Sequence, residues 1–145
     1  MTRRAVLAVA AVVLVVGAAW YLYDPPWVAS ITSGLRDWEE DPPGTRFRWT
    51  AGRASFFVPS KATEMTVPIR AIFPSPNAQP LTVTMRVDDR WLADIAIADV
   101  HEWTRTSVPL PRRGTWRHYR RVELRVNRTA GPYNLGVQLG EISLK

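Results

Sequence analysis

The sequence has 145 residues, 46% of them hydrophobic and 22% charged, no cysteine, two histidines and a formal net charge of +6. The missing cysteines exclude disulfides and thiol chemistry, and neither histidine has a partner at metal-ligand spacing, which argues against zinc. The basic excess falls entirely on residues 101–145, because residues 1–100 are neutral. A one-sided positive charge can attract anionic lipid headgroups or an anionic envelope polymer, and the alternative is that these charges only solvate the outer face of a sheet. The chain carries no recognisable nucleic-acid module, so we expect no nucleic-acid partner.

An unbroken apolar run, residues 5–22, follows Arg3 and Arg4. At about 1.5 Å per residue this run forms a helix of about 27 Å, close to the thickness of the hydrocarbon core of a bilayer. We predict a cytoplasmic n-region at 1–4 and an uncleaved transmembrane anchor at 5–23, with a cleaved signal peptide as the alternative. The aromatic residues that we place at the membrane interface are Trp20, Tyr21, Tyr23 and Trp27.

The charges that flank the run predict its orientation. Arg3 and Arg4 precede it, and Asp24 is the first charge after it. The positive-inside rule then places the N-terminus in the cytoplasm and the remaining chain outside. Because no second apolar run is long enough to span, we expect a single-pass protein of the cell membrane with an extracytoplasmic domain.

Residues 24–45 have the pattern of a juxtamembrane helix and linker. Asp24 and the two prolines after it suit a helix start, and the proline pair at 42–43 suits its end. The apolar positions recur at spacings of three and four, which is one face of a helix: Trp27, Ile31, Leu35 and Trp38. Such a helix lies either in the membrane interface or against the next domain.

From residue 46 to residue 145 the apolar pattern has a period of two, which is typical of half-buried strands. The clearest alternation lies at 65–73, 81–87 and 121–127, and further strands are predicted at 46–50, 53–58, 91–98, 103–110 and 134–144. Turn signals separate them at Ala51-Gly52, 74–80, Asp88-Asp89, Arg113-Gly114 and 130–132. In the last strand the inward parity changes at Gly140-Glu141, which predicts one inserted residue.

About eight strands without a helical period between them predict an all-β domain. We expect a two-sheet antiparallel β-sandwich of jelly-roll connectivity, and an immunoglobulin-like sandwich is the alternative. The strings FRWTAGRASFFVPS (47–60) and NLGVQLGEISL (134–144) resemble the two ends of a bacterial membrane-anchored β-sandwich module. That module is similar to galactose-binding-like jelly rolls and to the C-terminal modules of multi-spanning glycosyltransferase-like proteins. The resemblance covers about residues 24–145 and implies fold and location, and it carries over no catalytic residues.

The sequence contains no catalytic signature, so we predict that the protein is not an enzyme. No nucleophile elbow and no glycine-rich phosphate loop is present. The acidic residues of the domain's single acidic cluster are Asp88, Asp89, Asp94 and Asp99. Because aspartate is also favoured in turns, we expect no cofactor, with a structural calcium ion as the alternative reading.

The seven tryptophans point to a binding role. Aromatic faces beside polar groups suit sugar rings, which predicts a glycan site made of Trp103, Trp116, Tyr133, Asp99, His101 and Asn134. The alternative is that Trp49 and Trp103 fill the core and Trp116 braces a hairpin. The residues predicted to form a basic face are Arg105, Arg117, Arg121 and Arg125.

Two functions fit these features. The first is a non-catalytic, membrane-tethered extracytoplasmic module that binds envelope glycans or glycolipids. The second is an accessory or scaffold subunit of a larger membrane protein such as a glycosyltransferase.

Overall fold

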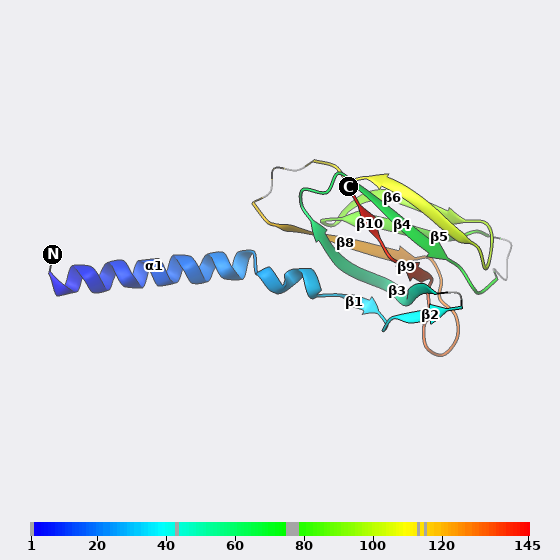
Figure 1. The fold of residues 1–145 in the computed structure, drawn as a ribbon, viewed down its shortest axis with the longest axis horizontal. Helices are drawn as coiled ribbons and strands as arrows, with labels where there is room; N and C mark the ends of the chain where they lie inside the picture. Colours follow the sequence, from blue (N-terminus) through cyan, green and yellow to red (C-terminus); the bar gives the residue numbers. More distant parts are fainter. Residues whose placement is uncertain (1, 43, 75–78, 113, 115) are drawn as a thin grey trace.

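The computed structural model describes residues 2–42, 44–74, 79–112, 114 and 116–145. A single long helix leads into a β-domain (Figure 1). The helices are α1 (Arg3–Tyr23) and the 3-10 helix η1 (Pro26–Ser30). The strands are β1 (Ser33–Leu35), β2 (Glu39–Asp41), β3 (Thr45–Pro59), β4 (Glu64–Arg70), β5 (Leu81–Val87), β6 (Arg90–Ile97), β7 (Trp103–Pro109), β8 (Tyr119–Val126), β9 (Gln138–Gly140) and β10 (Ser143–Leu144).

Helix α1 projects from the β-domain and buries none of its residues. Its apolar segment has a mean hydropathy of 2.5, so α1 is long and apolar enough to cross a membrane. Its aromatic end is also uncovered, with Trp20, Tyr21 and Tyr23 each about half exposed.

The strands form two antiparallel sheets packed as a β-sandwich of the jelly-roll type. Sheet A holds β1, β3, β8, β5 and β6, and sheet B holds β2, β3, β9, β10, β4 and β7. The predicted all-β sandwich is therefore confirmed, with connections that run from one sheet to the other.

Strand β3 belongs to both sheets. Residues 45–49 pair with β2 and β9 in sheet B, and residues 53–59 pair with β8 in sheet A. The predicted turn at Ala51-Gly52 is wrong, because the chain passes through these residues as one continuous strand. The small side chains that suggested a turn instead lie where the strand passes from one sheet to the other.

The core lies between the two sheets and follows the predicted alternation. In β4, β5 and β8 every second residue is buried, and the intervening residues are more exposed, except in the middle of β8. The inward residues of these strands are Met65, Val67, Ile69, Leu81, Val83, Met85, Val87, Val122, Leu124 and Val126. Phe73, predicted to point inward, is instead 38% exposed and stacks on Trp49, because β4 ends at Arg70.

The predicted juxtamembrane helix is wrong beyond its first turn. Among the described residues of 24–45 only η1 is helical, and β1 and β2 then pair with β3. The open edge of β3 offers backbone hydrogen bonds that an isolated short helix cannot match. Leu35 consequently packs against the core, while Trp27, Ile31 and Trp38 remain exposed.

The predicted one-residue insertion near Gly140 is confirmed. Both β9 and β10 pair with β4, but Leu139 lies opposite Ile69 and Ser143 lies opposite Thr66. Four steps along the last strand thus match three steps along β4. The extra residue turns Ile142 towards the core, although the terminal Leu144 is 40% exposed.

The other predicted turns have mixed outcomes. Asp88 and Asp89 both have positive φ and connect β5 to β6, as expected of a two-residue hairpin turn. Residues 130–132 lie in the loop after β8, as predicted. Most of the turn at 74–80, and Arg113 of the turn at 113–114, fall outside the described residues.

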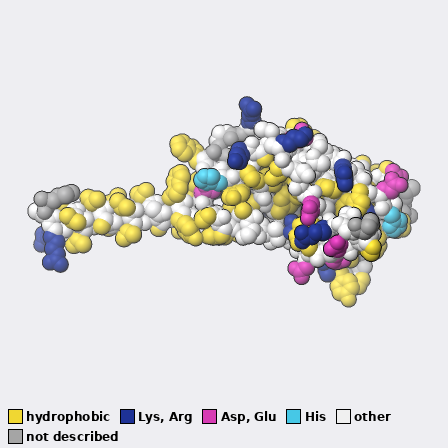
Figure 2. Space-filling model, viewed as in Figure 1, with side chains coloured by type: hydrophobic (Ala, Val, Ile, Leu, Met, Phe, Trp, Pro, Cys, Tyr) yellow, Lys and Arg dark blue, Asp and Glu magenta, His cyan; other side chains and the backbone are white. Residues whose placement is uncertain are grey.

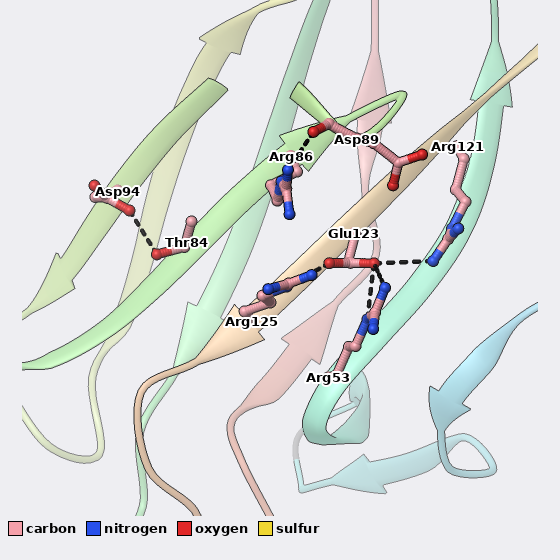
Figure 3. Close-up of polar contacts among 8 residues, drawn as sticks. All are labelled: Arg53, Thr84, Arg86, Asp89, Asp94, Arg121, Glu123 and Arg125. Carbon is pink, nitrogen blue, oxygen red and sulfur yellow. Dashed lines mark hydrogen bonds and ion pairs between the residues drawn. The ribbon is translucent and has the colours of Figure 1, made fainter. Parts of the chain in front are cut away.

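A single buried carboxylate organises the outer face of sheet A (Figure 3). The Glu123 side chain is 3% exposed and accepts hydrogen bonds from Arg53 at 2.5 and 2.8 Å, from Arg121 at 2.9 Å and from Arg125 at 2.5 Å. Burial alone would raise the pKa of Glu123, but the hydrogen bonds and charges of Arg125 and Arg53 outweigh it, so the pKa is lowered. The ion pairs join β3 to β8.

We expect Gly34→Ala to destabilise the domain. Gly34 has a φ of +65°, and a Cβ there would lie 2.0 Å from the backbone oxygen of Arg53. The loss should be about 1–3 kcal/mol of unfolding free energy, measured by chemical denaturation of the full chain in mild detergent. Gly114→Ala is the matched control, since no described residue beyond its chain neighbours lies within 4 Å of its Cβ position. Equal stability of the two variants would contradict this role for Gly34.

We expect the stability of the domain to fall in acid because of Glu123. A lowered pKa in the folded state stabilises the protein above the pKa of the unfolded chain, about 4.5, and this stabilisation is lost as the pH falls through the folded-state value. Denaturation measured from pH 7 downward should show a shallower acid dependence for Glu123→Gln than for the unsubstituted chain. Glu141→Gln is the control, because the Glu141 side chain is 65% exposed. The same acid slope in both variants would argue against this assignment.

Candidate functional site

A groove of about 490 Å³ lies on the outer face of sheet B. We call it the sheet groove. Its lining residues are Gly44, Thr45, Arg46, Thr66, Pro68, Trp103, Arg105, Gly140, Glu141 and Ser143. They come from β3, β4, β7, β9, β10 and the residues beside these strands, so the groove exists only when sheet B is assembled.

The pleat of the strands points these side chains outward. In β4 the buried Val67 and Ile69 alternate with Thr66, Pro68 and Arg70, which face away from the core. Across the ladder Pro68 lies opposite Arg105. The outward residues of two neighbouring strands therefore meet on one surface.

Gly140 keeps the floor of the groove open. A Cβ at this position would lie 3.1 Å from the Pro68 side chain and 3.4 Å from the Trp103 ring. The strand thus passes close to both side chains only because residue 140 has none. Pro68, Gly140 and Trp103 together make an apolar strip along the groove.

Arg70 holds the indole of Trp103 in place. Its guanidinium lies 4.6 Å from the Trp103 ring centroid and 5.5 Å from that of Phe47. The same group donates to Gln138 Oε1 at 2.7 Å and forms an ion pair with Asp41. An arginine fixed by two rings, an amide and a carboxylate leaves Trp103 little freedom to move, which preorganises the groove.

Polar side chains flank the apolar strip. Arg46 and Glu141 form an ion pair of 3.4 Å, with side chains 54% and 65% exposed. The hydroxyls of Thr66 and Ser107 share a hydrogen bond of 2.6 Å. An aromatic and apolar strip between hydrogen-bonding groups can stack on the C–H face of a ring while donors and acceptors meet its hydroxyls.

Trp38 is packed by arginines next to the groove. The guanidinium groups of Arg46 and Arg48 lie 5.0 and 4.7 Å from the Trp38 ring centroid. Burial lowers the pKa of Arg48, whose Nε finds no hydrogen-bond partner among the residues that the structure describes. Trp38 therefore positions Arg46 at the groove.

The structure does not bring the three predicted aromatics together. Trp103 lines the sheet groove, and Trp116 is 79% exposed beside the residues that contact the end of α1. Tyr133 is 69% exposed in the loop after β8, where Arg36 lies 5.6 Å from its ring. Trp116 precedes β8 and Tyr133 follows it, so they lie at opposite ends of that strand. In the alternative reading, the placement of Trp49 and Trp103 in the core is wrong, because neither belongs to it.

The predicted polar partners lie outside the sheet groove. Asp99, His101 and Asn134 are all exposed. The backbone of His101 donates to Ala71 at 2.7 Å, and the Asn134 side chain accepts from Thr129. His101 and Asn134 both have positive φ, so they shape loops.

The four predicted basic residues are divided among three surfaces. Arg105 lines the sheet groove, Arg121 and Arg125 bind Glu123 on sheet A, and Arg117 contacts Tyr23 of α1. Arg121 and Arg125 are four residues apart in β8, so they point to the same face of sheet A. Arg105 and Arg117 belong to other segments and lie on other surfaces.

Two residues of the acidic cluster, Asp88 and Asp94, make local contacts. Asp94 accepts from Thr84 at 2.6 Å and from the Trp91 ring at 3.2 Å, and Asp88 pairs with Arg120 at 3.1 Å (Figure 3 draws the Thr84 bond). Within the described ranges no three His, Cys, Asp or Glu side chains converge as metal ligands would.

Sequence reasoning missed most of the sheet groove. Thr66, Pro68 and Arg70 carry a usable signal, since their parity marks them as outward residues of β4. Arg46 and Glu141 carry none, because 95 residues separate them in the chain. Their pairing follows from β9 lying between β3 and β4, because Phe47 lies opposite Gly140 and Arg46 and Glu141 are the next residues along.

Comparison with known proteins bears on the fold. No protein-family model and no curated protein matches the sequence. Among solved structures, the chain is similar to the EclA C-terminal domain, described as a sugar-binding protein, with 17% identity, a TM-score of 0.51, and 75% of this chain and 90% of that chain covered. A family 6 carbohydrate-binding module is 11% identical with a TM-score of 0.49, covering 79% of this chain and 86% of that one. A family 35 carbohydrate-binding module from an environmental isolate is 13% identical with a TM-score of 0.46, covering 77% and 86%.

At these identities the likeness is one of fold. The similarity to the EclA C-terminal domain supports the β-sandwich fold that the sequence resemblance led us to expect. The likeness to modules of glycosyltransferase-like proteins remains a prediction. The chain has a jelly-roll β-sandwich behind one apolar N-terminal helix, and the sandwich is similar in fold to the EclA C-terminal domain.

Proposed function

We propose that this protein is a non-catalytic, membrane-tethered module that binds envelope glycans or glycolipids outside the cell, through the sheet groove. The observation that carries the proposal is the fixed indole of Trp103 on an apolar strip, with the Arg46–Glu141 pair and Arg105 beside it. Sugars need this combination, because they present apolar C–H faces and polar hydroxyls on the same ring.

The tether and the location are part of the same proposal. Helix α1 has the length and hydropathy of an anchor, with Arg3 and Arg4 on its N-terminal side. An anchor in this orientation holds the β-domain at the outer surface, where envelope polysaccharides and glycolipids are found. The fold similarity to a protein described as sugar-binding supports the proposal by analogy.

Replacing the Trp103 platform should weaken glycan binding. The full chain in mild detergent would be screened on an array of neutral and acidic oligosaccharides, and the best ligand titrated by calorimetry. For Trp103→Ala we expect Kd to rise about tenfold, equivalent to about 1.4 kcal/mol. Trp91→Ala is the matched control, because Trp91 is 64% exposed on sheet A and should leave Kd unchanged. No binding by the unsubstituted chain, or equal Kd values for the two variants, would refute the groove as a glycan site.

Closing the groove should act in the same direction without removing an aromatic ring. For Gly140→Val we expect loss of glycan binding, because the side chain would fill the space between Pro68 and Trp103. Near-UV circular dichroism would show whether the sandwich remains folded. Binding unaltered in a folded Gly140→Val variant would exclude the floor of the groove from the site.

The outer face of sheet A favours a second candidate, an accessory subunit of a larger membrane protein such as a glycosyltransferase. Three arginines, with side chains 39–58% exposed, share the one Glu123 carboxylate, so this cluster carries more positive than negative charge. Purification of the tagged chain from native membranes, followed by mass spectrometry, tests this candidate. A stoichiometric membrane partner that is lost in an Arg53→Ala, Arg125→Ala variant would establish the accessory role.

A further inference from the structure

The loop between β7 and β8 lies beside the C-terminal end of α1 (Figure 1). The Asp24 side chain, 3% exposed, accepts hydrogen bonds from the His118 backbone at 3.1 Å and contacts the His118 ring. The residues before these two are also in contact, because the Arg117 guanidinium lies 4.6 Å from the ring centroid of Tyr23. The end of α1 and this loop are therefore joined by two adjacent contacts.

The loop is also tied to the body of the sandwich at both ends. Arg120, 2% exposed, donates from Nη1 to the Pro111 carbonyl at 2.7 Å and pairs through Nε with Asp88. At the other end, the Ser60 backbone donates to the His118 carbonyl at 2.8 Å. These bonds fix the start and the end of the segment that presents Trp116.

The surface so presented is aromatic and basic. Trp116 is 79% exposed, and with Lys61 and Arg117 it borders a hollow of about 710 Å³. In the sequence, residues 111–118 contain three arginines and no acid. Two acids near this end already have partners: Asp24 contacts His118, and Glu64 pairs with Lys145 at 2.8 Å.

The region where the end of α1 meets the β-domain, which we call the joint, has an apolar surface with basic side chains next to it. Apolar side chains extend from α1 onto the adjoining part of the β-domain, with basic side chains beyond them (Figure 2). Tryptophan is enriched at the headgroup level of membranes, and arginine and lysine are attracted to anionic headgroups there. Tyr23, at the end of α1, is a second aromatic residue of the kind enriched at the headgroup level.

We propose that Trp116, Arg117 and Lys61 form a second membrane contact, which seats the β-domain on the anionic lipid headgroups of the leaflet that α1 leaves. This inference rests on the membrane anchoring proposed above, and it gives Trp116 a lipid role in place of the glycan role that the sequence suggested. Trp116 lies at the headgroup level, and each cation is attracted by the negative surface potential. Two contacts, α1 and this loop, then hold the domain in one orientation instead of letting it swing on a single helix.

The native chain has no cysteine, so single cysteines can be labelled selectively. Three full-length variants, Gly114→Cys in the loop, Tyr133→Cys at the far end and Val12→Cys in α1, would carry an environment-sensitive fluorophore. They would be reconstituted in phosphatidylcholine vesicles with and without phosphatidylglycerol and exposed to a lipid-soluble quencher. In anionic vesicles we expect strong quenching at positions 12 and 114 and none at 133.

Second-site changes in the Gly114→Cys chain identify the residues responsible. Trp116→Ala should abolish quenching at position 114. Lys61→Gln and Arg117→Gln should each shift the equilibrium between contact and withdrawal about fivefold, and omitting phosphatidylglycerol should shift it at least as far. Trp91→Ala, which removes an exposed tryptophan elsewhere, should change nothing.

The three positions separate the two proposals. Quenching at 12 with none at 114 would overturn the second contact and leave the anchor intact. No quenching at 12 would overturn both. Quenching at 114 that survives Trp116→Ala in a folded chain, shown by near-UV circular dichroism, would also overturn the assignment.

Discussion

The structure depends on the double membership of β3. This 15-residue strand pairs with β2 and β9 at its start and with β8 at its end, so it carries one continuous backbone from sheet B to sheet A. Both inner faces then close over a single core. A strand shared in this way also fixes what lies on its free edges, since β1 and β2 dock onto it and bring the chain from α1 to the sandwich. The position of the helix relative to the domain thus follows from hydrogen bonds to β3.

The two outer faces of the sandwich differ in how they use arginine. On sheet A three guanidinium groups converge on the buried carboxylate of Glu123, and the surplus positive charge stays at the surface. On sheet B the Arg70 guanidinium lies between Trp103 and Phe47 and is itself bound by Gln138 and Asp41. The first arrangement stabilises a strand pair and presents charge. The second holds an aromatic platform and leaves space beside it, which is why we assign binding to sheet B.

The two proposed contacts, with the membrane and with a glycan, lie on different parts of the β-domain. The end that carries Asp24, His118 and Trp116 belongs to the joint with α1, and the sheet groove lies on the side of the sandwich. A domain seated at that end would present its groove beside the membrane, within reach of glycolipid headgroups and of polysaccharide chains alike. The buried Arg120 connects the sandwich to the proposed membrane contact. It belongs to strand β8 and donates to the Pro111 carbonyl, at the start of the loop that meets the membrane in this proposal.

The apolar helix, the β-class of the domain and the inward faces of β4, β5 and β8 can be predicted from the amino-acid sequence, because they depend on local hydrophobic period and run length. The insertion near Gly140 can be predicted in the same way, since a change of parity is visible along one strand. The other features depend on contacts between distant parts of the chain. Residues 24–45 form strands instead of a helix because β3 offers backbone partners, which no local pattern records. The sequence does not distinguish Trp103 from Trp116 as binding residues. In the structure β4 and β9 form a groove around Trp103, whereas the contact between His118 and Asp24 holds Trp116 beside α1. Which residues share a surface is set by long-range strand pairing, and that information is distributed over the whole chain.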